Sequence, residues 1–463
     1  MALRLRPVQA REHEPTSYEN ALADELEAIF GTGVHDLPGL VTALNETGVR
    51  PSDGTDWTAE AFAAEMARLG EKEHVPFPAE GQAGRTAAHG GGGTAKHPSG
   101  NAALDTADGL VHLGLRNRWY ALCRSEEVRR GQLTRLERVG EELLLWRDAS
   151  GTVHVQEDRC PHRGARLSRG VHMGDRIACE YHGVQVDAEG VVVSVPGSPG
   201  CALEGKQSLR TFPAVEHADA VFAWFGDPEG GEPAPFVLPE GIGGEWDQFL
   251  SYVEWDAPWV YSLDNLMDPM HGAFLHRKSH SMAGGKREAV FQVRDTDTGF
   301  VFEKVDQAGL NFDWSEWIDT AMQWVRLEIP YPQTAGPGGA FRIVCTATPI
   351  NETQHAAFFW RCRKVQGWER DVWRFLYKTR LEERHWAVLE QDRLMEEAMP
   401  LDAWSRENLY QHDLALVRLR RLVRGEARKQ IAAREQRASA QPDAPGTPAA
   451  PTAPAATGTA VRA

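Results

Sequence analysis

The 463-residue chain has few cysteines, fewer basic than acidic residues, and no long apolar run. Six Cys in a chain of this length do not form the disulfide framework of a small secreted scaffold. Its 50 Lys and Arg against 66 Asp and Glu give a formal net charge of −16, which disfavours nucleic acid and anionic membranes as partners. No stretch approaches the roughly 20 apolar residues of a membrane span, and the N-terminus lacks the apolar core of a signal peptide. We therefore expect a cytoplasmic protein of two or three domains.

Hydrophobic periodicity and composition divide the chain into segments. Residues 1–80 carry apolar residues at helical spacing and predict a small helical module. Residues 81–108 are rich in Gly, Ala and Ser and predict a flexible linker. The Ala-, Pro- and Thr-rich residues 431–463 predict a disordered tail. The expected helices of the first segment span Tyr18–Phe30, Asp36–Leu44 and Thr58–Leu69, the last with Thr58 as its N-cap.

Residues 109–230 and 231–430 predict two domains that contain β-structure. Short β-like runs predict a small antiparallel sandwich in the first domain, over Glu142–Arg147, Thr152–Gln156, Val184–Val186, Val191–Val195 and Ala220–Phe225. Hairpins in the second domain pair Ala289–Arg294 with Phe300–Val305, and Phe341–Thr348 with Ala356–Arg363. Helices are expected over Glu369–Arg384, His385–Ala398 and Arg406 to about Arg428. Segregated strands and helices indicate an α+β fold rather than a doubly wound parallel sheet.

Two Cys-His pairs give the strongest chemical signal in the chain. Cys160 and His162 are two residues apart, and Cys179 and His182 are three apart. Two thiolates and two imidazoles are the ligands of a Rieske [2Fe-2S] cluster, in which the cysteines hold one iron and the histidines hold the other. The same residues also suit a structural zinc ion, since Cys2His2 is a zinc set. A third alternative is that the four are unrelated core residues.

The residues around these pairs distinguish the alternatives. The chain reads Cys-Pro-His-Arg-Gly-Ala-Arg-Leu-Ser from Cys160 and Cys-Glu-Tyr-His-Gly from Cys179, followed by the strand-like Val184–Val186. This stretch resembles the Rieske domain of ring-hydroxylating oxygenases nearly residue for residue. The resemblance implies a Rieske-type antiparallel β-sandwich and a [2Fe-2S] cluster held by Cys160, His162, Cys179 and His182.

A second motif lies between Asp264 and His276. It reads Asp-Asn-Leu-Met-Asp-Pro-Met-His-Gly-Ala-Phe-Leu-His, with His271 and His276 five residues apart and Asp268 three before the first of them. Two imidazoles and a carboxylate form a facial triad for non-haem Fe(II), which leaves positions for O₂ and substrate. The motif resembles the mononuclear iron motif of the Rieske oxygenases, and His280 is off its register. We take His271 and His276 as the histidine ligands.

The carboxylate ligand must come from elsewhere in the chain. The resemblance implies that a late helix supplies it, and Asp392 in the sequence Val-Leu-Glu-Gln-Asp-Arg-Leu-Met matches that position. Glu390 and Glu396 are rival carboxylates on the same predicted helix.

Asp268 has a different role in the resemblance. Its carboxylate accepts a hydrogen bond from His271 and another from His182 of the partner subunit, so that it links the two metals. The alternative is an Asp favoured by the dipole at a helix N-terminus. Asn265 is expected near the iron pocket. Several aromatic residues either line the substrate pocket or belong to the plain core, which we favour: Phe274, Phe312, Trp314, Trp317 and Trp324.

Together the motifs resemble the catalytic α subunit of a Rieske non-haem iron oxygenase over about residues 114–425. The resemblance implies a helix-grip-like antiparallel-sheet catalytic domain, a homotrimer, and electrons from a separate NAD(P)H-linked reductase, with or without a ferredoxin. The implied reaction is hydroxylation of an aromatic or related small organic substrate with O₂. The form of the second motif leans toward monooxygenases and demethylases, so oxidative O- or N-demethylation is the alternative.

Two further hypotheses belong to other classes of protein. A Rieske electron-transfer protein without catalysis of its own predicts the cluster but no mononuclear iron. The segment Leu44–Thr58 also resembles a small helical module of some site-specific recombinases, which raises the possibility of a DNA-binding regulator. Residues 1–80, however, hold 6 Lys and Arg against 15 Asp and Glu, and this balance favours packing or partner docking over DNA.

Overall fold

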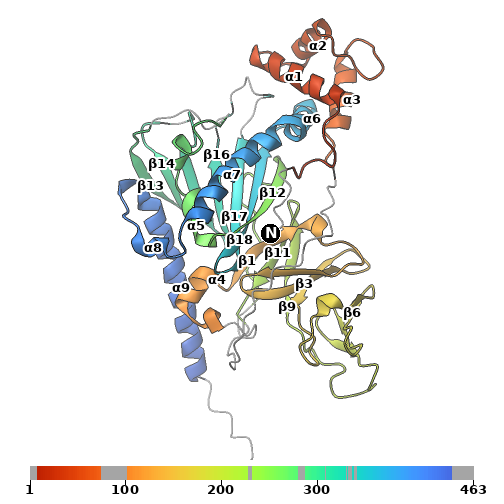
Figure 1. Ribbon diagram of the computed structural model, residues 1–463, viewed down its shortest axis with the longest axis vertical. Helices are drawn as coiled ribbons and strands as arrows, with labels where there is room; N and C mark the ends of the chain where they lie inside the picture. The colour runs from red at the N-terminus through yellow and green to blue at the C-terminus, as the bar shows by residue number, and fades with distance from the viewer. Residues whose placement is uncertain are drawn as a thin grey trace, which may run out of the picture.

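Three parts follow one another along the chain in the computed structural model: a helical module, a β-rich domain and a larger α+β domain (Figure 1). The structure describes residues 8–73, 102–227, 232–279, 287–307, 309–329, 331, 336–337 and 341–440. Residues 81–101 of the predicted linker, residues 441–463 of the predicted tail and His280 lie outside the described residues. The α+β fold class expected from the sequence is confirmed.

The N-terminal module consists of the three predicted helices. They are α1 (Ser17–Gly31), α2 (Leu37–Glu46) and α3 (Ala59–Leu69). Thr58 caps α3, since its hydroxyl accepts a hydrogen bond from Ala61 N at 3.1 Å. Phe62 and Met66 of α3 are buried in a core shared with α6 (Gly367–Leu376) of the α+β domain. Each such side chain contributes roughly 2 kcal/mol, so this core fastens the module to the α+β domain.

A short strap, residues 8–11, ties this module to two other parts of the chain. Gln9 is 2% exposed, and its side chain exchanges hydrogen bonds with the backbone of Tyr252, at 2.7 and 3.0 Å. The backbone N–H groups of Gln9 and Ala10 donate to one carboxylate oxygen of Glu382, at 2.5 and 2.9 Å. The module is therefore anchored where helix α7 (Glu382–Ala398) begins.

The β-rich domain contains three antiparallel sheets. One holds β1 (Arg118–Arg124), β11 (Ala220–Phe225) and β10 (Ala214–His217). A second holds β2 (Thr134–Arg138), β3 (Glu141–Arg147), β4 (Val153–Glu157) and β9 (Thr211–Phe212). The third holds β5 (Val171–His172), β6 (Arg176–Ala178), β7 (Gln185–Asp187) and β8 (Val192–Ser194). The five predicted runs correspond to β3, β4, β7, β8 and β11.

The α+β domain is built on a seven-stranded antiparallel sheet in the order β12-β18-β17-β16-β15-β14-β13. Its strands are β12 (Asp247–Trp255), β13 (Phe291–Thr296), β14 (Gly299–Lys304), β15 (Trp314–Asp319), β16 (Gln323–Glu328), β17 (Phe341–Asn351) and β18 (Gln354–Arg363). Both predicted hairpins are confirmed, as β13–β14 and β17–β18.

The two faces of this sheet bury different partners because side chains alternate along each strand. On one face Phe300, Trp317 and Phe359 pack against α5 (Trp259–Leu266), α7 and α9 (Leu414–Ala440). On the other face Trp324 and its neighbours pack against β1 and β11 of the β-rich domain. The sheet thus carries the helices on one side and the β-rich domain on the other.

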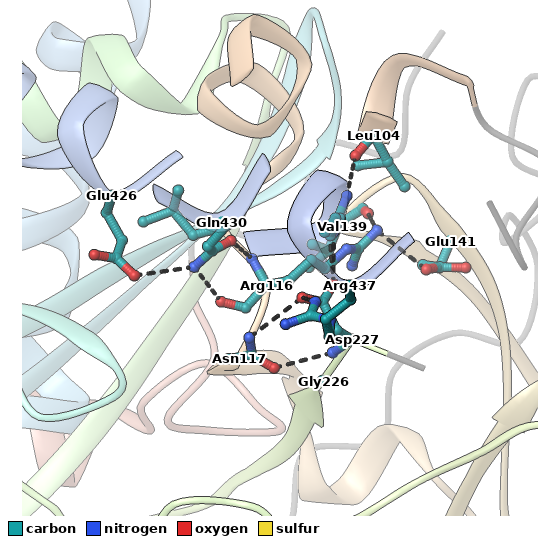
Figure 2. Close-up of polar contacts among 12 residues, drawn as sticks. Leu104, Arg116, Asn117, Val139, Glu141, Gly226, Asp227, Glu426, Gln430 and Arg437 are labelled. Carbon is teal, nitrogen blue, oxygen red and sulfur yellow. Dashed lines mark hydrogen bonds and ion pairs between the residues drawn. The ribbon is translucent and has the colours of Figure 1, made fainter. Parts of the chain in front are cut away.

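The last predicted helix has the wrong bounds. The short α8 (Ala403–Arg406) ends where that helix was expected to begin, and α9 continues to Ala440, so residues 431–440 are helix and not a disordered tail. The end of α9 meets the β-rich domain, where Gln430 exchanges hydrogen bonds with the backbone of Arg116 at 2.9 and 2.7 Å. Figure 2 shows this junction, with Asp227 on the β-rich side facing the end of the helix. Partners far away in sequence therefore extend the helix.

The predicted linker is also wrong over residues 102–108. These residues contribute to a 3₁₀ turn, Ala102–Asp105, and to α4 (Ala107–Leu113), whose Leu110 and Leu113 are buried against the core that contains α9. None of the helices within the described ranges combines the length and apolar character needed to cross a bilayer.

Candidate metal centres

The two Cys-His loops of the β-rich domain have the same backbone hydrogen bonds. In each loop the Cys N–H donates to the carbonyl five residues on, at 2.7 Å for Cys160 and 2.8 Å for Cys179. The glycine four residues on, Gly164 or Gly183, donates back to the Cys carbonyl at 2.8 and 2.9 Å. Both glycines have positive φ, 75° and 72°, which a side chain rarely adopts. The two turns therefore have equivalent backbone hydrogen bonds and present their cysteines at the same position, whereas the histidines come from the second position after Cys160 and the third after Cys179.

These loops place the thiols inside and the imidazoles outside. Cys160 and Cys179 are 3% and 2% exposed and do not form a disulfide, whereas His162 and His182 are exposed with ring centroids 4.7 Å apart. Burial raises the pKa of the Cys160 thiol to about 11, so a thiolate there requires the positive charge of a metal. Buried sulfur ligands for one iron and exposed imidazoles for the other fit a Rieske cluster.

The second motif brings three ligand atoms together in the α+β domain. His271, His276 and Asp392 each offer one such atom, and these atoms lie within 4.8 Å of one another. Asp392 Oδ1 on α7 is 3.2 Å from His276 Nε2 and 3.7 Å from His271 Nε2. The histidines come from the segment after α5, and the carboxylate comes from more than 100 residues later. This donor set fits the facial triad of a non-haem Fe(II) site.

Neighbouring side chains orient these three residues. His276 is 1% exposed, and its Nδ1 lies 3.0 Å from Gln391 Oε1, which leaves Nε2 directed at Asp392. Asn265 Nδ2 donates to Asp392 Oδ1 at 3.2 Å. Burial lowers the pKa of His276, but the adjacent Asp392 carboxylate raises it, and the net direction is upward. The expectation that Asn265 lies near the pocket agrees with this contact, whereas the contact of Gln391 was not foreseen.

Asp268 lies beside the triad and not within it. Its Oδ2 is 3.9 Å from His271 Nδ1, a buried nitrogen without a hydrogen-bond partner, and its Oδ1 accepts a hydrogen bond from Met270 N at 2.8 Å. The side chain of Asp268 is 31% exposed. One carboxylate thus faces both the His271 ring and the protein surface, and its role as a bridge to a partner subunit stays a prediction.

The rival carboxylates face other partners. Glu390 is 55% exposed and pairs with Arg393. Glu396 is buried, and its Oε2 is 2.7 Å from the hydroxyl oxygen of Ser262. Neither belongs to the cluster that contains Asp392.

The aromatic residues divide between the site and the core. Phe312 lies against His271, with ring centroids 5.8 Å apart. Trp317 is buried in the helix-facing core, and Trp324 is buried against the β-rich domain, as our preference for plain core residues predicted. Phe274 is 46% exposed, and Trp314 is half-buried.

Family models match three segments of the chain. They describe a recombinase-like helix-turn-helix domain over residues 1–71, a Rieske [2Fe-2S] domain over residues 118–213, and the C-terminal domain of vanillate O-demethylase oxygenase over residues 255–429. The second match contains both Cys-His loops, and the third contains the His-His-Asp site. The second match therefore favours a [2Fe-2S] cluster in the Cys-His loops over a structural zinc ion.

Curated proteins similar to this chain include oxygenase components. The oxygenase component of chloroacetanilide N-alkylformylase from Rhizorhabdus wittichii is 37% identical over 172 residues, which is 35% of this chain and 47% of the relative. The vanillate O-demethylase oxygenase subunit from Pseudomonas sp. is 29% identical over 179 residues, 35% of this chain and 46% of the relative. The chain thus aligns with about half the length of these relatives.

Similarity to solved structures extends to the whole fold of the two iron domains. The terminal oxygenase of carbazole 1,9a-dioxygenase from Novosphingobium sp. KA1 has a TM-score of 0.57 at 22% identity, covering 69% of this chain and 94% of that one. Dicamba monooxygenase has a TM-score of 0.55 at 22% identity, covering 68% and 98%. Both domain families of the Rieske non-haem iron oxygenases are thus present in this chain, one after the other. Members of this family carry a [2Fe-2S] cluster in the first domain and mononuclear iron in the second.

Proposed function

We propose that the chain is the oxygenase component of a system that hydroxylates an aromatic or related small organic substrate with O₂. The observation that carries the proposal is the convergence of His271 Nε2, His276 Nε2 and Asp392 Oδ1 in a chain that also has the two Cys-His loops. A Rieske electron carrier needs the loops but has no use for the triad. Electrons are proposed to come from an NAD(P)H-linked reductase, with or without a ferredoxin.

Each site residue has a defined task in this proposal. Cys160, His162, Cys179 and His182 hold the cluster, and His271, His276 and Asp392 hold Fe(II), which supplies O₂ activation when bound. Gln391 accepts a hydrogen bond from His276 Nδ1–H and so keeps Nε2 free for the metal. Phe312 packs edge-on against the His271 ring and so helps to hold that ring in place.

The proposed homotrimer pairs Asp268 with the partner subunit's His182. Exposed aromatic side chains near both residues support it: Tyr181 in the second Cys-His loop is 60% exposed, and Tyr410, whose pKa the Asp268 carboxylate helps to raise after burial, is 57% exposed. Large apolar side chains that are exposed together are typical of subunit interfaces. Several of the similar structures are complexes of the carbazole 1,9a-dioxygenase oxygenase with its ferredoxin, which supports a ferredoxin as the partner.

Oxidative demethylation is the second candidate. The C-terminal domain matches the vanillate O-demethylase family, and relatives include an O-demethylase acting on dicamba and an N-alkylformylase. Hydroxylation of a methyl carbon on oxygen or nitrogen releases formaldehyde, whereas ring hydroxylation does not. Formaldehyde measured per O₂ consumed, over a panel of aromatic and methoxylated substrates with a surrogate reductase, separates the two candidates.

Electron paramagnetic resonance tests the proposal itself. Anaerobic protein is reconstituted with Fe(II), reduced with dithionite and exposed to nitric oxide. We expect a Rieske signal together with a high-spin iron–nitrosyl signal that is lost in His271→Ala. A Rieske signal alone contradicts the oxygenase proposal and leaves the electron-carrier hypothesis.

A further inference from the structure

A buried chain of hydrogen bonds lies one helical turn beyond Asp392. Glu396 Oε2 is 2.7 Å from Ser262 Oγ on α5, and the same Oγ is 2.7 Å from His355 Nε2 on β18. His355 Nδ1 is in turn 2.7 Å from the carbonyl oxygen of Ala257. The three side chains are 3%, 1% and 0% exposed, and none of them belongs to the proposed triad.

The direction of each hydrogen bond in this buried series follows from which atoms can donate a hydrogen and which can only accept one. The carbonyl of Ala257 only accepts, so His355 Nδ1 carries a hydrogen and donates it. In a neutral imidazole His355 Nε2 then accepts, and the Ser262 hydroxyl donates its single hydrogen to it. The oxygen of Ser262 is left as an acceptor, and Glu396 must supply the proton as a neutral acid.

The alternative order places a positive charge on His355 and a negative charge on Glu396. Complete burial disfavours both charges, lowering the pKa of His355 to about 4 and raising the pKa of Glu396 well above its ordinary value. In that alternative order the Ser262 hydroxyl donates to the Glu396 carboxylate and lowers the pKa of Glu396, but burial outweighs this bond, and the nearby carboxylates of Asp392, Asp264 and Glu397 reinforce the rise. The neutral order is therefore the stable one.

The same contacts fix the helix that carries Asp392. On α5, Ser262 comes three residues before Asn265, and on α7, Glu396 comes four residues after Asp392. The Asn265–Asp392 contact of 3.2 Å and the Ser262–Glu396 contact of 2.7 Å are thus successive rungs between α5 and α7. His355 attaches the second rung to the sheet. A rotation or slide of α7 that moved Asp392 away from the histidines breaks this rung.

We propose that Glu396, as a neutral acid hydrogen-bonded through Ser262 to His355, is a positioning residue for Asp392. The inference rests on the proposed iron site. The Ser262–Glu396 contact sets the position of α7 and therefore of the Asp392 oxygens. Because the Glu396 side chain is neutral, it adds no second negative charge to the buried space beside them. Glu396 then differs from a spare ligand, because its Oε2 is occupied by Ser262 and the residue is not part of the His271–His276–Asp392 cluster.

Two substitutions at Glu396 test whether a neutral hydrogen-bond donor at this position is enough to keep Asp392 in place. In Glu396→Gln the amide still donates to Ser262 and stays neutral, so we expect the iron–nitrosyl signal and the Fe(II) affinity of the wild type. In Glu396→Ala the rung is lost, and we expect a changed nitrosyl line shape with Fe(II) affinity roughly 10-fold weaker, the usual effect of removing a group that orients a metal ligand. A thermal unfolding curve of each variant, compared with the wild type, reports whether the α+β domain is folded.

Ser262→Ala breaks the rung without changing α7, and we expect it to change the nitrosyl line shape as Glu396→Ala does. Glu390→Gln is the matched control, since Glu390 lies on the same helix and is 55% exposed; it should leave the signal unchanged. Infrared difference spectra should show the C=O stretch of a protonated carboxylic acid in the wild type that is missing in Glu396→Gln.

Either of two results overturns the inference: Glu396→Gln behaving like Glu396→Ala, or both rung-breaking variants retaining the wild-type nitrosyl line shape and affinity. Absence of the nitrosyl signal from the wild type itself is a different result, because it contradicts the proposed iron site on which the inference depends.

Discussion

Removal of Arg434 should loosen the junction between α9 and the β-rich domain. The guanidinium donates to Asp227 Oδ1 at 2.9 and 2.5 Å and to the carbonyl of Leu104 at 2.6 Å. The Asp227 side chain is only 4% exposed, so Arg434→Ala leaves a buried carboxylate that keeps the longer contacts of Arg437 Nη2 and Asn117 Nδ2, both 3.4 Å from Oδ2. Breaking a buried pair costs about 3–5 kcal/mol. Because the Arg434 side chain is 19% exposed, we discount this to about 2–3 kcal/mol.

Arg437→Ala is the matched control at the same carboxylate. Arg437 reaches Asp227 Oδ2 at 3.4 Å with a side chain that is 39% exposed, so its removal should cost less than about 1 kcal/mol. Differential scanning fluorimetry at one scan rate compares the two variants with the wild type. At roughly 2 °C per kcal/mol for a chain of this size, Arg434→Ala should lower Tm by about 4–6 °C and Arg437→Ala by less than about 2 °C.

The ranking of the two variants decides the test. Equal shifts, or a larger shift for Arg437→Ala, contradict the prediction, because the shorter and more buried contacts of Arg434 with this carboxylate should make its loss the costlier one. In 1 M salt the Arg437→Ala shift should shrink further, whereas the Arg434→Ala shift should persist, since buried pairs are screened less.

Three further predictions follow from the sites and the strap. Asp392→Ala should remove the mononuclear iron while the Rieske signal stays, so iron analysis should fall from about three to about two per chain. Cys179→Ser should abolish the Rieske signal, whereas Cys201→Ser, which alters a half-buried cysteine outside the loops, should retain it. Burial raises the pKa of Glu382 from its ordinary 4.5 to about 7, so folding takes up a proton and the unfolding free energy falls as pH rises from about 4.5 to 7, by up to roughly 3 kcal/mol. Glu382→Gln should flatten that fall in thermal unfolding followed against pH, and an unchanged slope contradicts it.

Features that depend on neighbours along the chain could be predicted from the amino-acid sequence alone. Cys160 and His162 belong to one turn, as do Cys179 and His182. Their spacing in the sequence therefore already indicates which candidate metal ligands lie together. His271 and His276 are likewise close in sequence. The helices of the N-terminal module and the β13–β14 and β17–β18 hairpins follow from apolar periodicity and turns, which are also local.

Contacts between residues that are distant in sequence could be seen only in the tertiary structure. Asp392 and Glu396 are one turn apart on the same helix, and only packing against α5 directs the first to the histidines and the second to Ser262. The last turns of α9 include Arg434, which forms an ion pair with Asp227 of the β-rich domain. Apolar periodicity does not reveal this distant partner, so the predicted helix ended too early. His355 gave no signal of its own in the sequence, because its partners lie almost 100 residues away and its meaning comes only from the fold. Local patterns define which groups a segment can present, and long-range packing selects which of those groups meet.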